Sequence, residues 1–80
     1  MAKKSRITLK AYEPRYHARI RLYQRVSKEL ELYDRQEVAD IANVSYQTIT
    51  NYEMGNIKLP NPSVLRRVAY AIGIEVQGDL

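Results

Sequence analysis

Apolar residues recur at spacings of three and four along most of the chain, which is the period of an amphipathic α-helix. In residues 14–32 they form one stripe, which predicts a first helix with these inward positions: Tyr16, Ile20, Tyr23, Val26 and Leu30. Pro14 suits the first turn of that helix, because the N–H that proline lacks has no helical partner there. Residues 6–11 alternate apolar and polar side chains instead, which predicts either a short strand or a basic arm.

A second helix is predicted over residues 35–42. Asp34 is a favourable N-cap in front of it, and Glu37 stands three positions later, as in a capping box. Asn43 stands where this helix must end, because asparagine adopts the left-handed conformation nearly as readily as glycine does. The helix would turn one apolar side towards the core, formed by Val38, Ala39 and either Ile41 or Ala42.

A third helix is predicted over residues 46–53, with Ser45 as its N-cap and Gly55 at its end. When the residues are placed at about 100° intervals around the helix axis, Ile49 and Tyr52 point inward. The opposite face is uncharged and rich in amide and hydroxyl groups, whereas an ordinary solvated helix would carry lysine and glutamate there. This face consists of Gln47, Thr50, Asn51 and Met54, with Tyr46 and Thr48 at its flanks.

A fourth helix follows a polar loop. Asn61 is its N-cap, Pro62 takes its first position and Gly73 ends it. Its inward stripe is Val64, Leu65, Val68, Ala69 and Ile72. These patterns predict an all-α fold. Since 80 residues suffice for one domain, we expect a single unit (1–80) with a basic N-terminal arm or strand (1–13), a helical domain (14–74) and a C-terminal tail (75–80).

Charge is distributed unevenly along the chain. Residues 1–28 carry nine lysines and arginines and one acid, whereas residues 29–57 carry one arginine and six acids. A basic half suits a polyanion such as nucleic acid or an anionic membrane surface, although a solvated helix face carries similar charge. The chain has neither an apolar run of membrane-spanning length nor a signal-peptide segment, so we expect a cytoplasmic protein without a membrane partner.

The composition argues against several kinds of chemistry. The chain has no cysteine and one histidine, so neither a disulfide framework nor a thiolate metal site is expected. No serine is placed with a catalytic base, and the chain contains no glycine-rich phosphate loop and no cluster of inward carboxylates. We therefore expect that the protein is not an enzyme and binds neither a cofactor nor a small-molecule ligand.

The outward face of residues 46–53 suits base recognition in the major groove of DNA. Glutamine and asparagine amides pair bidentately with adenine N6 and N7, and threonine meets a thymine methyl group or a base edge. Groups suited to DNA phosphate surround this face: Arg35, Ser45, Asn56 and Lys58. Arg35 opens the second helix, where the backbone N–H groups and the helix dipole also favour an anion.

The order of residues from 34 to 74 forms a longer pattern, whose elements are Val38-Ala39, Val44-Ser45, Thr48-Ile49-Thr50, Tyr52-Glu53, Gly55, Pro60, Leu65 and residues 68–74. This pattern resembles the Cro/C1-type (XRE) helix-turn-helix family of bacterial and phage DNA-binding regulators. The resemblance implies a compact bundle of four or five helices of the phage-repressor type, and a homodimer on a roughly two-fold site in double-stranded DNA. By position it implies base reading by Tyr46, Gln47 and Asn51, with Thr50 beside them, and phosphate contacts from Arg35, Ser45, Asn56 and Lys58.

The chain departs from the family pattern in and around this motif. Arg35 stands where the family usually has glutamine, and we expect it to hold a phosphate through its charge rather than through an amide. Asn43 stands where the family usually has glycine. Many members place a basic residue of the first helix against the glutamate that matches Glu53, and two residues could serve here, Lys28 or Arg25.

The leading hypothesis is a sequence-specific transcriptional regulator, namely a small repressor of phage, plasmid or bacterial origin. One alternative is an antitoxin, which would also bind DNA but would fold residues 1–12 or the apolar tail on a toxin. Another is a protein-interaction module that keeps the fold without the DNA, which the acidic residues 29–40 favour.

Overall fold

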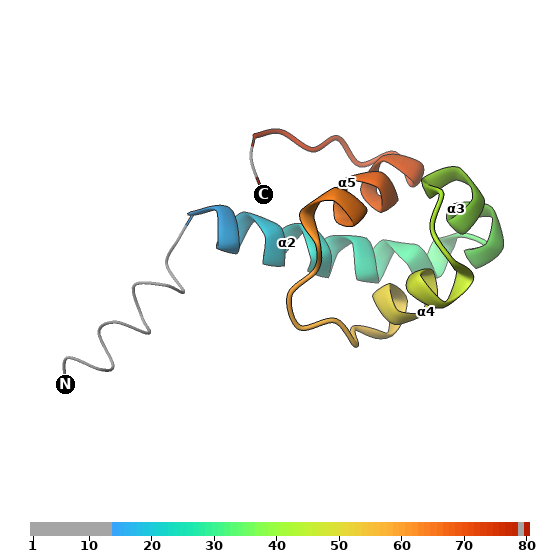
Figure 1. Ribbon diagram of the computed structural model, residues 1–80. Helices are drawn as coiled ribbons and strands as arrows, with labels where there is room; N and C mark the ends of the chain where they lie inside the picture. The colour runs from blue at the N-terminus through green and yellow to red at the C-terminus, as the bar shows by residue number, and fades with distance from the viewer. Residues whose placement is uncertain (1–13, 79) are drawn as a thin grey trace.

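Four α-helices and a short 3-10 helix surround one apolar core in the part of the chain that the computed structural model describes, residues 14–78 and 80 (Figure 1). In chain order they are α2 (Pro14–Glu29), the 3-10 helix η1 (Leu30–Leu32), α3 (Arg35–Ala42), α4 (Tyr46–Met54) and α5 (Pro62–Ala71). The predicted all-α bundle is confirmed. The strand or arm predicted before Pro14 lies outside the described residues.

The long helix α2 runs lengthwise through the molecule, and the three shorter helices gather around its C-terminal half (Figure 1). Its apolar stripe is buried at Tyr23 and Val26, and the chain continues that stripe at Leu30 in η1. The upstream positions Tyr16 and Ile20 are half-buried. The stripe thus provides the surface on which α4 and α5 pack.

The first helix ends earlier than the pattern predicts. Its α-helical part stops at Glu29, and Leu30–Leu32 form a single tighter 3-10 turn rather than the last turn of an α-helix. Tyr33 is then extended (φ −126°, ψ 157°), which turns the chain towards the start of α3. A 3-10 turn is a common way to end an α-helix, and here it accompanies the burial of the Leu30 side chain.

Helix α3 has the predicted bounds but a different N-terminal hydrogen bond. The Asp34 carboxylate accepts from the Gln36 N–H at 2.8 Å. No described contact returns from Glu37, which is exposed, so the capping box is not formed. The open choice between two inward residues is settled by burial, because Ala42 is 3% exposed and Ile41 is 58% exposed.

The C-terminal segment completes the core. Helix α5 begins as predicted, with the Asn61 side chain accepting from the Ser63 and Val64 N–H groups, and Gly73 follows its end at φ +81°. The tail then returns over the helices (Figure 1), where Ile74 and Leu80 are buried. The tail therefore adds apolar side chains to the core.

None of the helices in the described range is long and apolar enough to cross a membrane.

Candidate nucleic-acid interface

A tight turn places α4 against α3. Asn43 adopts the predicted left-handed conformation (φ 58°, ψ 50°), and the Val44 N–H donates to the Ala39 carbonyl at 3.0 Å. The Ser45 hydroxyl then caps α4, because its oxygen accepts from the Thr48 N–H at 3.0 Å. The helix ends at Gly55, whose φ of 72° would strain any residue with a Cβ atom.

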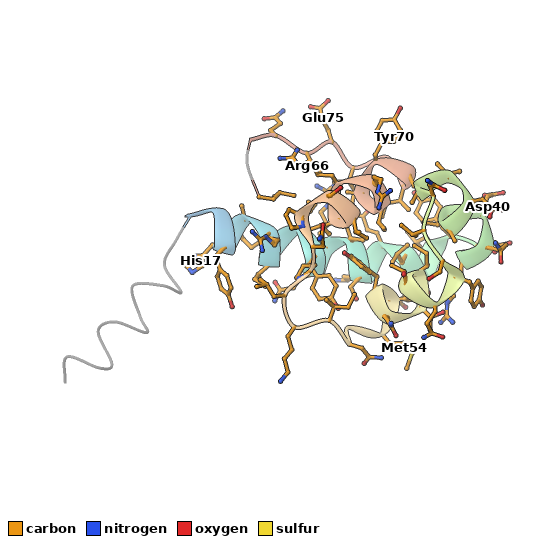
Figure 2. All side chains as sticks on the ribbon, in the orientation of Figure 1. His17, Asp40, Met54, Arg66, Tyr70 and Glu75 are labelled. Carbon is orange, nitrogen blue, oxygen red and sulfur yellow. The ribbon has the colours of Figure 1, made fainter. Side chains whose placement is uncertain are left out.

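Helix α4 has the two faces that the periodicity predicts. Ile49 and Tyr52 are essentially fully buried, whereas Met54 is 64% exposed and Tyr46 is 48% exposed. Gln47 is exposed, and Thr50 and Asn51 are half-buried, as is the flanking Thr48. In Figure 2 Met54 projects from the opposite side of the molecule to Tyr70 and Glu75.

The two amides on the outer face are linked to each other. The Gln47 Nε2 donates to the Asn51 Oδ1 at 3.1 Å, across one helical turn. This bond restricts the rotamers of both side chains in the free protein. It leaves the Gln47 Oε1 and both Asn51 Nδ2 hydrogens without a described partner, so the pair presents an acceptor and donors together on the surface.

Arg35 lies between α3 and α4 rather than projecting freely from the start of α3. Its Nε donates to the Glu53 carboxylate at 2.8 Å, and its Nη1 donates to the Thr50 hydroxyl at 3.5 Å. The hydrogen bond to Glu53, followed by one to the Tyr46 hydroxyl, raises the pKa of the guanidinium, so the side chain is charged at any physiological pH. The guanidinium is thus held by three side chains of α4, namely those of Glu53, Thr50 and Tyr46.

This arrangement corrects the predicted partner of Glu53. Neither of the two α2 residues expected to face it does so, since Arg25 pairs with Glu29 at 2.8 Å and no described ion pair involves Lys28. The basic partner comes instead from Arg35, 18 positions before Glu53. Helix α2 contributes through Ser27, whose hydroxyl donates to the Glu53 carbonyl at 3.1 Å near the end of α4.

The loop after α4 carries the other two predicted phosphate contacts. Asn56 and Lys58 are both exposed, and neither side chain has a described hydrogen bond or ion pair. The loop is held in place because the Ile57 N–H donates to the Tyr23 hydroxyl at 3.1 Å. The ring of Tyr23 in turn packs edge-on against Tyr52, with centroids 5.3 Å apart, so the loop is tied to the underside of α4.

The predicted residues therefore differ in how free they are to contact a ligand. The Ser45 hydroxyl is 2.8 Å from the Thr48 hydroxyl, and the Thr50 hydroxyl donates to the Tyr46 carbonyl at 3.2 Å. The structure links Arg35 to Thr50 and Gln47 to Asn51, whereas Asn56 and Lys58 lie in the loop after α4 without a described contact to the other predicted site residues. The Arg35–Glu53 pair was missed, although Arg35 is the only cation among the six acids of residues 29–57, which is a signal for an internal ion pair.

Within the described residues no group of three or more histidines or carboxylates is placed to hold a metal ion.

Comparison with known families agrees with this geometry. A helix-turn-helix family model matches residues 25–78, which include all of α3, α4 and α5 and the end of α2. No curated protein and no solved structure matches the chain.

Proposed function

Because the chain belongs to the Cro/C1-type (XRE) helix-turn-helix family of DNA-binding regulators, we propose that it is a sequence-specific repressor whose α4 reads bases in the major groove. The observation that carries this proposal is the outer face of α4, which is uncharged, rich in amides, and exposed at Tyr46, Gln47 and Met54. This family is a DNA-binding regulatory domain and is not typically enzymatic.

The base-reading set comprises Tyr46, Gln47, Thr50 and Asn51. The Gln47 and Asn51 amides carry most of the discrimination in this proposal, because an amide can both accept from adenine N6 and donate to adenine N7. Their mutual hydrogen bond supports the role, since it holds two flexible side chains before DNA arrives and so reduces the entropy lost on binding.

The phosphate contacts come from Arg35, Ser45, Asn56 and Lys58. Lys58 contributes most of the non-specific attraction, because its charge is exposed and unpaired among the described residues. Arg35 contributes less charge, since Glu53 neutralises part of it. The N–H groups at the start of α3 add to this contact.

We further propose that two copies bind one operator with approximate two-fold symmetry in the cytoplasm. Helix-turn-helix dimers place their reading helices in successive major grooves, about 34 Å apart along the duplex. Occupancy of such a site would exclude other DNA-binding proteins, which is the simplest way for this domain to repress transcription.

Selection of bound sequences from a random pool of duplex DNA tests the proposal. We expect enrichment of a motif with two inverted half-sites. A matched control selection with the double variant Gln47→Ala, Asn51→Ala should enrich a weaker or different motif. If the unmodified protein enriches no sequence at all, the proposed function is wrong.

A second candidate function is protein interaction without DNA binding. One observation favours it, namely an open groove between the end of α3, α5 and the tail, lined by Ile41, Tyr70, Ile74 and Val76 together with Arg66 and Arg67. Tyr70 is 80% exposed there. The same DNA selection separates the two functions, because an interaction module of this kind would enrich no sequence.

A further inference from the structure

The Thr50 hydroxyl is already committed inside the protein. It donates its only hydrogen, over 3.2 Å, to the backbone carbonyl of Tyr46, which lies one turn earlier in α4. Its oxygen also lies 3.5 Å from the Arg35 Nη1, which donates to it. A hydroxyl has one hydrogen and two lone pairs, so these two bonds use its donor and one of its acceptor sites.

The second of these partners is itself held in place. Arg35 cannot swing towards Thr50 or away from it without breaking the 2.8 Å contact between its Nε and the Glu53 carboxylate. The Glu53 end of α4 is further tied to α2 by the bond from the Ser27 hydroxyl. The hydroxyl of Thr50 is thus directed towards the protein by contacts from α3 and α4 together.

Thr50 therefore has no hydrogen left to donate to DNA, and it can offer one acceptor site or its Cγ2 methyl group. We infer that Thr50 reads thymine through contact between this methyl and the thymine C5-methyl group, and that Arg35 is a positioning residue that directs the hydroxyl away from the base. The inference rests on the proposed DNA-binding function and adds a specificity to it. Apolar contact of a threonine methyl with a thymine methyl is chemically matched, since the contact removes the apolar surface of both groups from water.

The neighbouring side chains suit the same kind of site. Gln47 lies three positions before Thr50 and Asn51 follows it, and both carry amides that pair with adenine. A thymine reader beside two adenine readers points to consecutive A·T pairs under α4.

Two substitutions separate the methyl group from the hydroxyl. Thr50→Ser keeps the hydroxyl and both of its hydrogen bonds but removes the methyl, whereas Thr50→Val keeps a methyl and removes the hydroxyl. Each variant is titrated against the half-site selected from the random pool, and against copies in which each thymine in turn is replaced by deoxyuridine. Deoxyuridine pairs as thymine does and lacks only the C5-methyl. Thr48→Ser, which removes a methyl from the flank of the same helix, is the matched control.

For the unmodified protein, one deoxyuridine position should weaken binding by about fourfold, which corresponds to ~0.8 kcal/mol for one buried methyl group. The affinity of Thr50→Ser for the thymine site should be lower than that of the unmodified protein by a similar factor. Replacing this thymine with deoxyuridine should not lower the affinity of Thr50→Ser further. Thr50→Val should bind within about twofold of the unmodified protein and remain sensitive to deoxyuridine. Thr48→Ser should retain both the affinity and the sensitivity. Thermal unfolding of each variant verifies that the fold is intact.

Two results would overturn the inference while leaving the proposed function in place. One is tight binding to the selected site that no deoxyuridine replacement weakens. The other is a loss of affinity in Thr50→Val larger than that in Thr50→Ser, which would assign the reading to the hydroxyl. Failure of the unmodified protein to enrich any sequence would instead overturn both proposals.

Discussion

Replacing Asn51 with alanine should separate base reading from general attraction to DNA. The structure places the Asn51 amide half-buried on the outer face of α4, where it could make one bidentate contact to adenine. Such a contact discriminates by about 1–3 kcal/mol, which corresponds to a loss of roughly 5- to 150-fold at the selected site. Binding to unrelated duplexes should change by less than about twofold, because phosphate contacts dominate it.

The effect on stability should be small by comparison. The only described side-chain bond of Asn51 is the one that it accepts from Gln47, and a bond of this spacing on a helix surface contributes about 0.2–0.5 kcal/mol. The variant should therefore unfold within a few degrees of the unmodified protein. A binding defect that is much larger than the stability defect would assign Asn51 to the interface.

A double-mutant cycle tests the link between the two amides. Because the Gln47 Nε2 donates to the Asn51 Oδ1, removal of Asn51 also releases Gln47. The losses from Gln47→Ala and Asn51→Ala should then fail to add, by about 0.5 kcal/mol or more in the binding free energy. Fluorescence anisotropy with the selected site and with a scrambled duplex, at one salt concentration, measures all four proteins. Gln24→Ala, at an exposed glutamine of α2, is the control.

Two outcomes would refute this reasoning. If Asn51→Ala and Gln47→Ala both bind the selected site as tightly as the unmodified protein, the outer face of α4 does not read bases. If either variant weakens both duplexes equally, the affected side chain contacts phosphate rather than a base.

Three further predictions address phosphate contact, burial and assembly. Lys58→Ala should weaken binding to all duplexes and reduce the slope of log K against log salt by about one unit, and an unchanged slope would remove Lys58 from the phosphate contacts. Burial, and then the neighbouring Tyr23, raises the pKa of Tyr52 to about 12. The pKa of a tyrosine in the unfolded chain is about 10, so the unfolded chain loses its proton first as the pH rises. The free energy of unfolding should therefore fall by up to roughly 2–3 kcal/mol between about pH 10 and pH 12. Denaturant unfolding of Tyr52→Phe at several pH values should lack this loss, and an equal loss in that variant would show that other groups cause it. Finally, if the alternating residues 6–11 form a dimer element, deletion of residues 1–11 should lower the mass measured by light scattering, whereas an intact dimer would show that they form only an arm.

The helix bounds in the central motif were predictable because their signals are local. Asp34, Ser45 and Asn61 each cap the helix that follows, and the side chain of each reaches a backbone N–H two or three positions ahead. Such contacts depend on neighbours in the chain and not on the rest of the fold. One local detail of this motif failed, the capping box at Glu37, and it concerned an exposed side chain that the fold does not constrain.

The amphipathic period distinguished opposite faces of a helix but not two adjacent residues. It identified Ile49 and Tyr52 as core and the opposite side of α4 as surface, since these positions lie far apart around the helix. It could not choose between Ile41 and Ala42, which lie about 100° apart at the edge of the apolar stripe of α3. In the packed structure the smaller residue, Ala42, lies in the core, and the larger one, Ile41, lies beside the open groove.

The sequence by itself determined that α4 has an uncharged, amide-rich outer face held on a buried apolar side, because periodicity and capping act within a few residues. Only the tertiary structure decided which of these groups are free. Arg35 and Glu53 are 18 positions apart, and their contact depends on how α3 packs against α4. That packing places the Arg35 guanidinium in an ion pair and beside the Thr50 hydroxyl, which itself donates to the Tyr46 carbonyl.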